Sequence, residues 1–327
     1  MLYVSTRSKY DADTTPWALR NDTASDGGRY LPYKLPSLSL ADLKDKSYGQ
    51  TVADVLNQFF GTGLSGWDVE FSVGRNPVKL VSIGQKITVA ECWRNLDGSY
   101  DALEKNLAAR ICGCDARNVT VTSWVRIAIR IAVLTAIFGD LQRQGFEGYL
   151  DVSVPVGDMT QIMALWYARV MGLPIGKIIC GCQDNDGVWD LLHVGQMKTA
   201  IKPAAELERL IHGAFGVDEV LRYCGVCDRG ETYQLLPVMS DALKRVMFAA
   251  VVSENRVSGA IPNVYSTSAY ILEPEVAVGY SSLLDYRAKT GERAQALLLS
   301  DRNPIDAADA VAAAMHITPA KLKELLV

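Results

Sequence analysis

The segment between residues 150 and 180 restricts the fold more than any other part of the sequence. Leu150–Val154 is a short apolar run typical of a buried strand, and Gly157 can supply the turn after it. Asp158 is expected to begin a helix, and Lys177–Cys180 is a second strand-like run. The buried face of the helix should comprise Met159, Ile162, Met163, Trp166 and Val170. This order predicts two neighbouring parallel strands joined by a helical crossover.

The rest of the chain supplies further elements of the same kind. Helices are predicted at 51–60, 101–111 and 304–315, and strands at 78–90 (around a turn at Gly84) and at 296–299. The predicted fold class is α/β, with a mainly parallel sheet flanked by helices. We expect residues 1–80 to form an N-terminal α+β region and residues 81–327 to form the α/β core.

Several motifs resemble those of the threonine synthase family and follow the family order along the chain. The run Val154-Pro155-Val156-Gly157-Asp158-Met159-Thr160-Gln161-Ile162 resembles the family's phosphate loop, V-P-T-G-N-F-G-D-I. Further matches are Ser5-Thr6-Arg7, Asp26-Gly27-Gly28, Ser123-Trp124-Val125-Arg126-Ile127, Leu207-Glu208-Arg209-Leu210 and Tyr270-Ile271-Leu272-Glu273-Pro274. The resemblance implies the tryptophan-synthase-β-like fold (fold type II) of enzymes that use pyridoxal phosphate (PLP).

The run that carries the family's Schiff-base lysine is altered. Aligned without gaps, the lysine position holds Asp101; with a four-residue insertion, Lys105 takes that position. Both alignments remain open from the sequence. The small domain that follows the lysine in the family is largely deleted, because only a few turns separate Lys105 from Trp124. The resemblance therefore implies a truncated and divergent member.

The residues expected to hold the cofactor are Gly157, Asp158, Met159, Thr160 and Asp301. The helix dipole after Gly157 favours an anion, but the Asp158 carboxylate would repel a phosphate group, and Thr160 replaces a flexible glycine. Asp301 stands where a family threonine meets the pyridine nitrogen. It could pair with that nitrogen, although we favour a role as the cap of the helix that enters at Pro304.

Lys105 has two interpretations. It is the candidate catalytic lysine if the insertion alignment holds, since it lies one helical turn from Asp101 on the same face. The interpretation that we favour is an exposed ion pair between Asp101 and Lys105 on a surface helix.

Composition excludes several classes of protein. The net charge is −4 and the sequence has no cluster of basic residues, so we expect no nucleic-acid-binding surface. The most apolar helix candidate contains Arg126 and Arg130, so we expect no membrane span. The first residues do not resemble a signal peptide, and we expect a cytoplasmic protein with reduced cysteines. Three scattered histidines give no support for a metal site.

These departures lead us to expect a catalytically degenerate, threonine-synthase-like protein that acts in binding or interaction, without a cofactor. The alternative is a PLP-dependent lyase or transferase on an O-phosphorylated or otherwise activated amino acid, using Lys105. A small anionic or amino-acid ligand is compatible with the first hypothesis. Loss of the small domain should expose apolar surface on the 124–138 helix, which predicts a homodimer or a complex with another protein.

Overall fold

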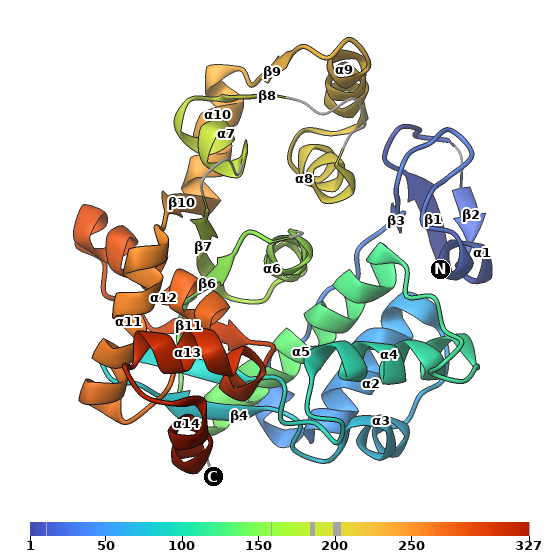
Figure 1. The fold of residues 1–327 in the computed structure, drawn as a ribbon. Coiled ribbons are helices and arrows are strands. Elements are labelled where there is room, and N and C mark those ends of the chain that lie inside the picture. Colours follow the sequence, from blue (N-terminus) through green and yellow to red (C-terminus); the bar gives the residue numbers. More distant parts are fainter. Residues whose placement is uncertain (11, 158, 184–186, 199–203, 327) are drawn as a thin grey trace.

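The computed structural model describes the chain except for residues 11, 158, 184–186, 199–203 and 327. At its centre is a six-stranded sheet with the order β10-β7-β6-β11-β5-β4 (Figure 1). Neighbouring strands are parallel except for β4 and β5, which are antiparallel and joined through Gly84. The strands are β4 Lys79–Ser82, β5 Ile87–Glu91, β6 Leu150–Pro155, β7 Ile175–Cys182, β10 Met247–Val251 and β11 Ala296–Ser300. The predicted fold class and the parallel pairing of β6 with β7 are confirmed.

Helices cover both faces of this sheet, because its strands are apolar on both sides. Leu297 and Leu299 of β11 join the core formed with α5 and α6, whereas Ala296 and Leu298 join the core formed with α11–α14. The helices of these layers are α4 Tyr100–Cys112, α5 Ser123–Arg143, α6 Thr160–Val170, α11 Glu254–Ser268, α12 Pro274–Thr290, α13 Ala308–Ala314 and α14 Pro319–Leu326. No described helix is long and apolar enough to cross a bilayer.

The N-terminal residues form a separate small sheet with the order β2-β1-β3 (Figure 1). Its elements and the helices after it are β1 Leu2–Ser5, β2 Ala12–Thr14, α1 Thr15–Arg20, β3 Tyr30–Pro32, α2 Tyr48–Phe60 and α3 Gly66–Val73, with a 3₁₀ turn at Leu43–Asp45. Helix α2 begins with a capping box between Ser47 and Gln50 and ends at Gly61, whose φ of 65° suits a glycine. The predicted helix at 51–60 and its end are thus confirmed. The domain boundary near residue 80 stays a prediction.

A third group of elements extends from the end of β7. It comprises α7 Gly187–His193, β8 Gln196–Lys198, α8 Ala205–Phe215, α9 Val217–Asp228, β9 Thr232–Gln234 and α10 Pro237–Val246. Strands β8 and β9 pair antiparallel. Helix α8 packs against α6, so this group lies beside the predicted phosphate loop.

Two sequence predictions about helix surfaces are wrong. The 124–138 helix, within α5, is not exposed: α2, α4 and α6 pack around it, and Trp124, Ile131 and Phe138 are buried. Helix α4 connects directly to α5 and packs against it, so no bare apolar face is left there. Val170 is also not buried; it is the last residue of α6, and 57% of its surface is exposed at the helix end.

Candidate functional site

A cavity of about 560 Å³ opens at the carboxyl ends of β6 and β11, where parallel α/β sheets bind ligands. Strand β6 ends at Pro155, and Asp301 directly follows β11. Helices α4 and α5 supply the opposite wall. The lining residues are Ser99, Tyr100, Asp101, Glu104, Arg126, Arg130, Pro155, Val156, Gly157, Gln161, Glu275, Asp301, Arg302, Asp306 and Ala307.

Arg130 of α5 lies at the centre of the polar lining. Its Nη1 donates to Asp301 Oδ2 at 2.9 Å, and its Nε lies 3.0 Å from Glu104 Oε1 in an ion pair. The guanidinium also lies over the Tyr100 ring, 4.3 Å from the centroid. Gln161 Nε2 donates to the same Asp301 oxygen at 2.7 Å. Residues from α4, α5, α6 and the end of β11 therefore meet in one ion network.

Glu104 is the most deeply buried carboxyl group of this network, with 2% of its side chain exposed. Its second oxygen lies 3.3 Å from Arg126 Nη1. Burial raises the pKa of Glu104 to about 7, even though Arg130 and Arg126 act in the opposite direction. Burial lowers the pKa of the Arg130 guanidinium, but the neighbouring Asp301 and Tyr100 raise that pKa above its ordinary value, so the group stays charged.

A second cavity of about 830 Å³ lies on the other side of the turn after β6. Arg126, Val156 and Gly157 line both cavities, so the two spaces meet at this turn. The second cavity extends toward the third group of elements and includes Asp190, Lys198 and Glu206 in its wall.

The predicted phosphate-loop residues are divided between these cavities. Gly157, with φ at 46°, lines both, whereas Met159 and Thr160 line the second. Helix α6 begins at Thr160, with Met159 at its N-cap in a left-handed conformation. Asp158 lies outside the described residues. The positive end of α6 thus faces the junction, where it favours an anion by roughly 0.3–1 kcal/mol.

Lys105 does not line either cavity. Its Nζ lies 2.8 Å from Asp101 Oδ2, and about half of each side chain is exposed. The interpretation of Asp101 and Lys105 as a surface i,i+4 ion pair is therefore confirmed. Asp101 nevertheless reaches the rim of the first cavity.

Asp301 does not cap the helix that enters at Pro304, so that prediction is wrong. Asn303 takes the cap, accepting from Ile305 N at 3.1 Å, because it directly precedes Pro304. Asp301 instead turns toward α5 and α6. The predicted 304–315 helix is a 3₁₀ turn, Pro304–Ala307, followed by α13.

Sequence reasoning missed Glu104, Arg130 and Gln161 as site residues. One signal was available: two arginines four residues apart, Arg126 and Arg130, interrupt an otherwise apolar helix. Arginines within a packed apolar helix require carboxylate partners, which marks Arg126 and Arg130 as members of a polar site.

The lining of the first cavity does not fit PLP. Among the described residues, no lysine lines this cavity, so no amine is placed there to form an imine; Lys198 lies in the wall of the second cavity. Each lining arginine already has a carboxylate partner: Glu104 for Arg126, Glu104 and Asp301 for Arg130, and Glu275 for Arg302. A phosphate dianion would compete with these carboxylates.

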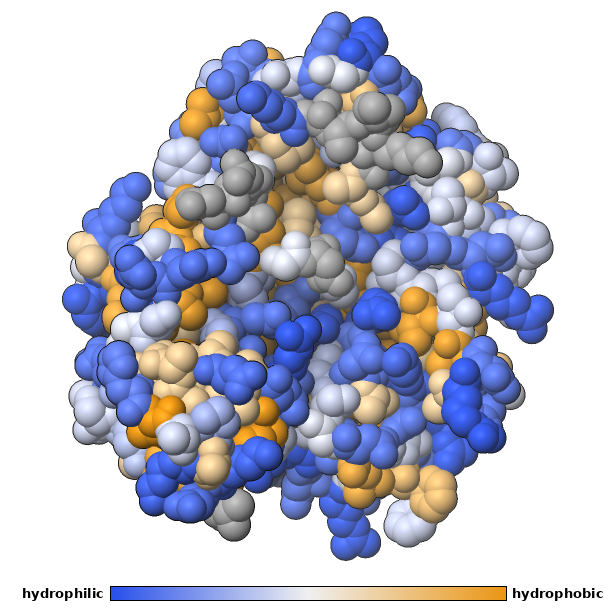
Figure 2. All heavy atoms as spheres, viewed as in Figure 1, coloured by the Kyte–Doolittle hydropathy of each residue, from blue (hydrophilic) through white to orange (hydrophobic). Residues whose placement is uncertain are grey.

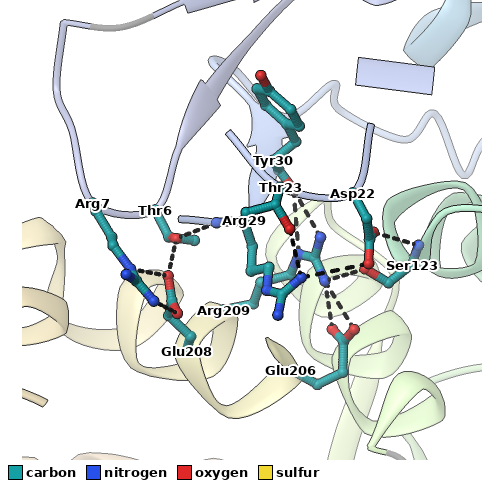
Figure 3. Close-up of polar contacts among 10 residues, drawn as sticks. All are labelled: Thr6, Arg7, Asp22, Thr23, Arg29, Tyr30, Ser123, Glu206, Glu208 and Arg209. Atoms are coloured by element: carbon teal, nitrogen blue, oxygen red, sulfur yellow. Dashed lines mark hydrogen bonds and ion pairs between the residues drawn. The ribbon is translucent and has the colours of Figure 1, made fainter. Parts of the chain in front are cut away.

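A second polar network joins the N-terminal sheet to α8 and α5 (Figure 3). Arg7 binds Glu208 through two bonds of 3.1 and 2.9 Å, and the Thr6 hydroxyl donates to the same carboxylate. Arg209, which is fully buried, donates to Glu206, to the Ser123 hydroxyl and to the Tyr30 carbonyl. The Ser5-Thr6-Arg7 and Leu207–Leu210 motifs thus serve to hold the N-terminal sheet in place.

The sheet order, the helix that starts after β6 and the cavity at the strand ends define an α/β fold of the PLP-enzyme type. Residues 2–73 match the family described as threonine synthase N terminus. "Threonine synthase-like 1" from Homo sapiens is 30% identical over 175 residues, which are 48% of this chain and 23% of that protein. The chain therefore spans less than a quarter of this relative.

Solved structures agree on the fold. PLP-bound threonine synthase from Brucella melitensis superposes with a TM-score of 0.83 at 20% identity, covering 100% of this chain and 94% of that one. Threonine synthase from yeast gives 0.79 at 17% identity, with coverage of 99% and 93%. The chain has an N-terminal domain of the threonine synthase family and the fold of threonine synthases.

Proposed function

We propose that this chain is a threonine-synthase-like protein that has lost PLP chemistry and acts through binding or interaction, in the cytoplasm. One observation carries the proposal: the Glu104–Arg130–Asp301 ion network lines the cavity at the strand ends, and among the described residues no lysine lines it. PLP catalysis of this type requires an imine with a lysine amine. The amine of Lys105 lies outside, in a solvent-exposed pair.

The second candidate is a PLP-dependent lyase or transferase that uses Lys105. Its supporting observation is that Asp101, the ion-pair partner of Lys105, lines the cavity rim, so the Lys105 ammonium lies 2.8 Å from a lining residue. The cavity as it stands favours the non-catalytic function.

The two functions are separated by turnover of O-phosphohomoserine with added PLP. We expect no release of phosphate or threonine by the native protein or by Lys105→Ala. Lys321→Ala is the matched control, because Lys321 forms a comparable exposed ion pair with Glu324. Release that disappears in Lys105→Ala but persists in Lys321→Ala would establish the catalytic function.

Association with a second chain is part of this proposal. The surface that supports it is helix α3, not the 124–138 helix expected from the sequence. Helix α3 carries Trp67 and Phe71, one turn apart and each 66% exposed. On the face shown in Figure 2, hydrophilic residues predominate and apolar ones form small separate groups. Light scattering of the native protein and of Trp67→Asp tests whether α3 forms an interface; we expect a dimer that the substitution weakens. A monomer at high concentration contradicts it.

A further inference from the structure

Strand β4 forms one edge of the six-stranded sheet and pairs on one side, with β5. At the hairpin turn Ile83 N donates to Ile87 O at 3.0 Å, and the bonding direction alternates from residue to residue along an antiparallel strand. The backbone N–H and C=O groups of Leu80 and Ser82 therefore point away from β5, and they bond to no described residue. An edge of this kind is a template for a further strand.

A cavity of about 500 Å³ lies beside this edge, where the start of β4 meets the end of α5. Its lining includes three cationic side chains, Lys79, Arg94 and Arg143, and one carboxylate, Asp140. Arg143 is already engaged, because it pairs with Asp140 and donates to the backbone carbonyls of residues 43, 44 and 46. The charge that remains for a ligand is that of Lys79 and Arg94.

These two cations have donors to spare. Lys79 is exposed and has no partner among the described residues. Arg94 donates from Nε to Glu91 Oε2 at 2.8 Å, and its guanidinium lies 4.2 Å from the centroid of the Trp93 ring. Glu91 is buried and does not line the cavity. The two terminal nitrogens of Arg94 bond to no described residue, and 42% of its side chain is exposed, so both residues can bind a carboxylate.

The two observations together select the occupant of this edge. A second copy of the chain is disfavoured, because β4 has four residues and its pairing with another β4 would bring two cationic cavities together. A lysine on an edge strand discourages pairing between like-charged copies and admits a strand that carries carboxylates. A small free anion would use the cations but leave the outward backbone groups of β4 unpaired. An extended acidic peptide satisfies both.

Resting on the proposed function, in which the chain acts through interaction, we propose that the outer edge of β4 binds an extended acidic segment of a partner protein. The segment adds as a further strand, with its backbone bonded to Leu80 and Ser82 and its carboxylates held by Lys79 and Arg94. Backbone bonds give a complex of this kind its affinity, and the charges give it selectivity.

Fluorescence anisotropy tests the proposal with the intact chain and a labelled hexapeptide of alternating glutamate and valine. This peptide combines carboxylates with a residue type that favours strands. We expect saturable binding at low salt that weakens as salt is added. A hexapeptide of alternating lysine and valine should not bind. The glutamate peptide with every amide N-methylated should not bind either, because it keeps the charge but has no backbone donors.

Two substitutions separate the backbone from the charge. Ser82→Pro removes an outward N–H, leaves the bonds toward β5 in place and should lower the affinity for the glutamate peptide at least about tenfold. Ser82→Ala is the matched control and should bind as the native protein does, because it keeps that N–H. Lys79→Glu should lower the affinity about fivefold, as for an exposed charge. Lys34→Glu, which changes an exposed lysine outside this lining, should leave the affinity unchanged.

Lys79→Glu also covers the case in which Ser82→Pro folds poorly, because the Lys79 side chain is exposed. No binding of the glutamate peptide, equal binding of the lysine peptide, or unchanged affinity in Lys79→Glu would overturn the inference. Each of these results leaves the proposed function in place. A reducible imine with added PLP would instead overturn the proposed function, so the two failures are distinguishable.

Discussion

The two buried arginine–carboxylate networks of this molecule are built from the same residue types but differ in how completely their groups are paired. In the N-terminal network, both Glu208 oxygens accept hydrogen bonds, and Arg209 donates from Nε and both terminal nitrogens. In the cavity network, Asp301 Oδ1 accepts no hydrogen bond from the described residues, and Arg130 Nε and Glu104 Oε1 lie 3.0 Å apart as an ion pair without forming a hydrogen bond. Burial raises the pKa of Glu104 to about 7. The completely paired network stabilises the fold, whereas the incompletely paired one keeps buried polar atoms without hydrogen bonds, which costs free energy.

The largest expected effect lies in the complete network. Arg209→Ala should lower the free energy of unfolding by about 3–5 kcal/mol. The substitution removes the ion-pair partner of the buried Glu206 carboxylate and the donors to the Tyr30 carbonyl. Urea-induced unfolding measures this loss. Arg117→Ala, which breaks an exposed pair with Asp115, should cost no more than about 1 kcal/mol. Similar losses in both variants would contradict the structural role of Arg209.

The next effect concerns the pH dependence of the cavity network. The pKa of Glu104 rises from an ordinary 4.5 to about 7 on folding, so the folded state retains a proton that the unfolded state releases. The contribution of Glu104 to the free energy of unfolding is largest below pH 4.5. It is lost as the pH rises to about 7, and the total loss is up to about 3 kcal/mol.

Glu104→Gln should therefore flatten the stability profile between pH 5 and 7. Burial also raises the pKa of Glu273, the N-cap of α12, to about 7. Glu273→Gln should therefore remove a part of the pH dependence of the free energy of unfolding that is independent of Glu104. Urea unfolding at pH 5, 6, 7 and 8 measures both. A native slope that persists unchanged in Glu104→Gln would show that the carboxyl group is not held as described.

The smallest effect is expected for the candidate catalytic lysine. Lys105→Ala should change the free energy of unfolding by less than about 0.5 kcal/mol, because it removes one exposed i,i+4 ion pair. Thermal unfolding of this variant beside Lys321→Ala gives the comparison. A loss above about 2 kcal/mol would mean that Lys105 has contacts inside the protein.

The sequence predicts the sheet better than the site. Strands β6 and β7 and the helix between them follow from short apolar runs bounded by Gly157, Gly172 and Pro174, which are local signals. The cavity network joins residues 104, 130, 161 and 301, which come together only through the sheet topology. Nothing near Asp301 in the sequence shows that Asn303 takes the helix cap and releases Asp301 to pair with Arg130.

The central claim, that the incomplete network has replaced PLP chemistry, is tested most directly by the absorbance spectrum of the purified chain with added PLP, before and after borohydride reduction. Peptide mass analysis of the reduced protein then locates any modified lysine. We predict no internal-aldimine band and no specifically modified lysine. A stable band, with the reduced adduct at Lys105, would contradict the claim and make this chain a PLP enzyme.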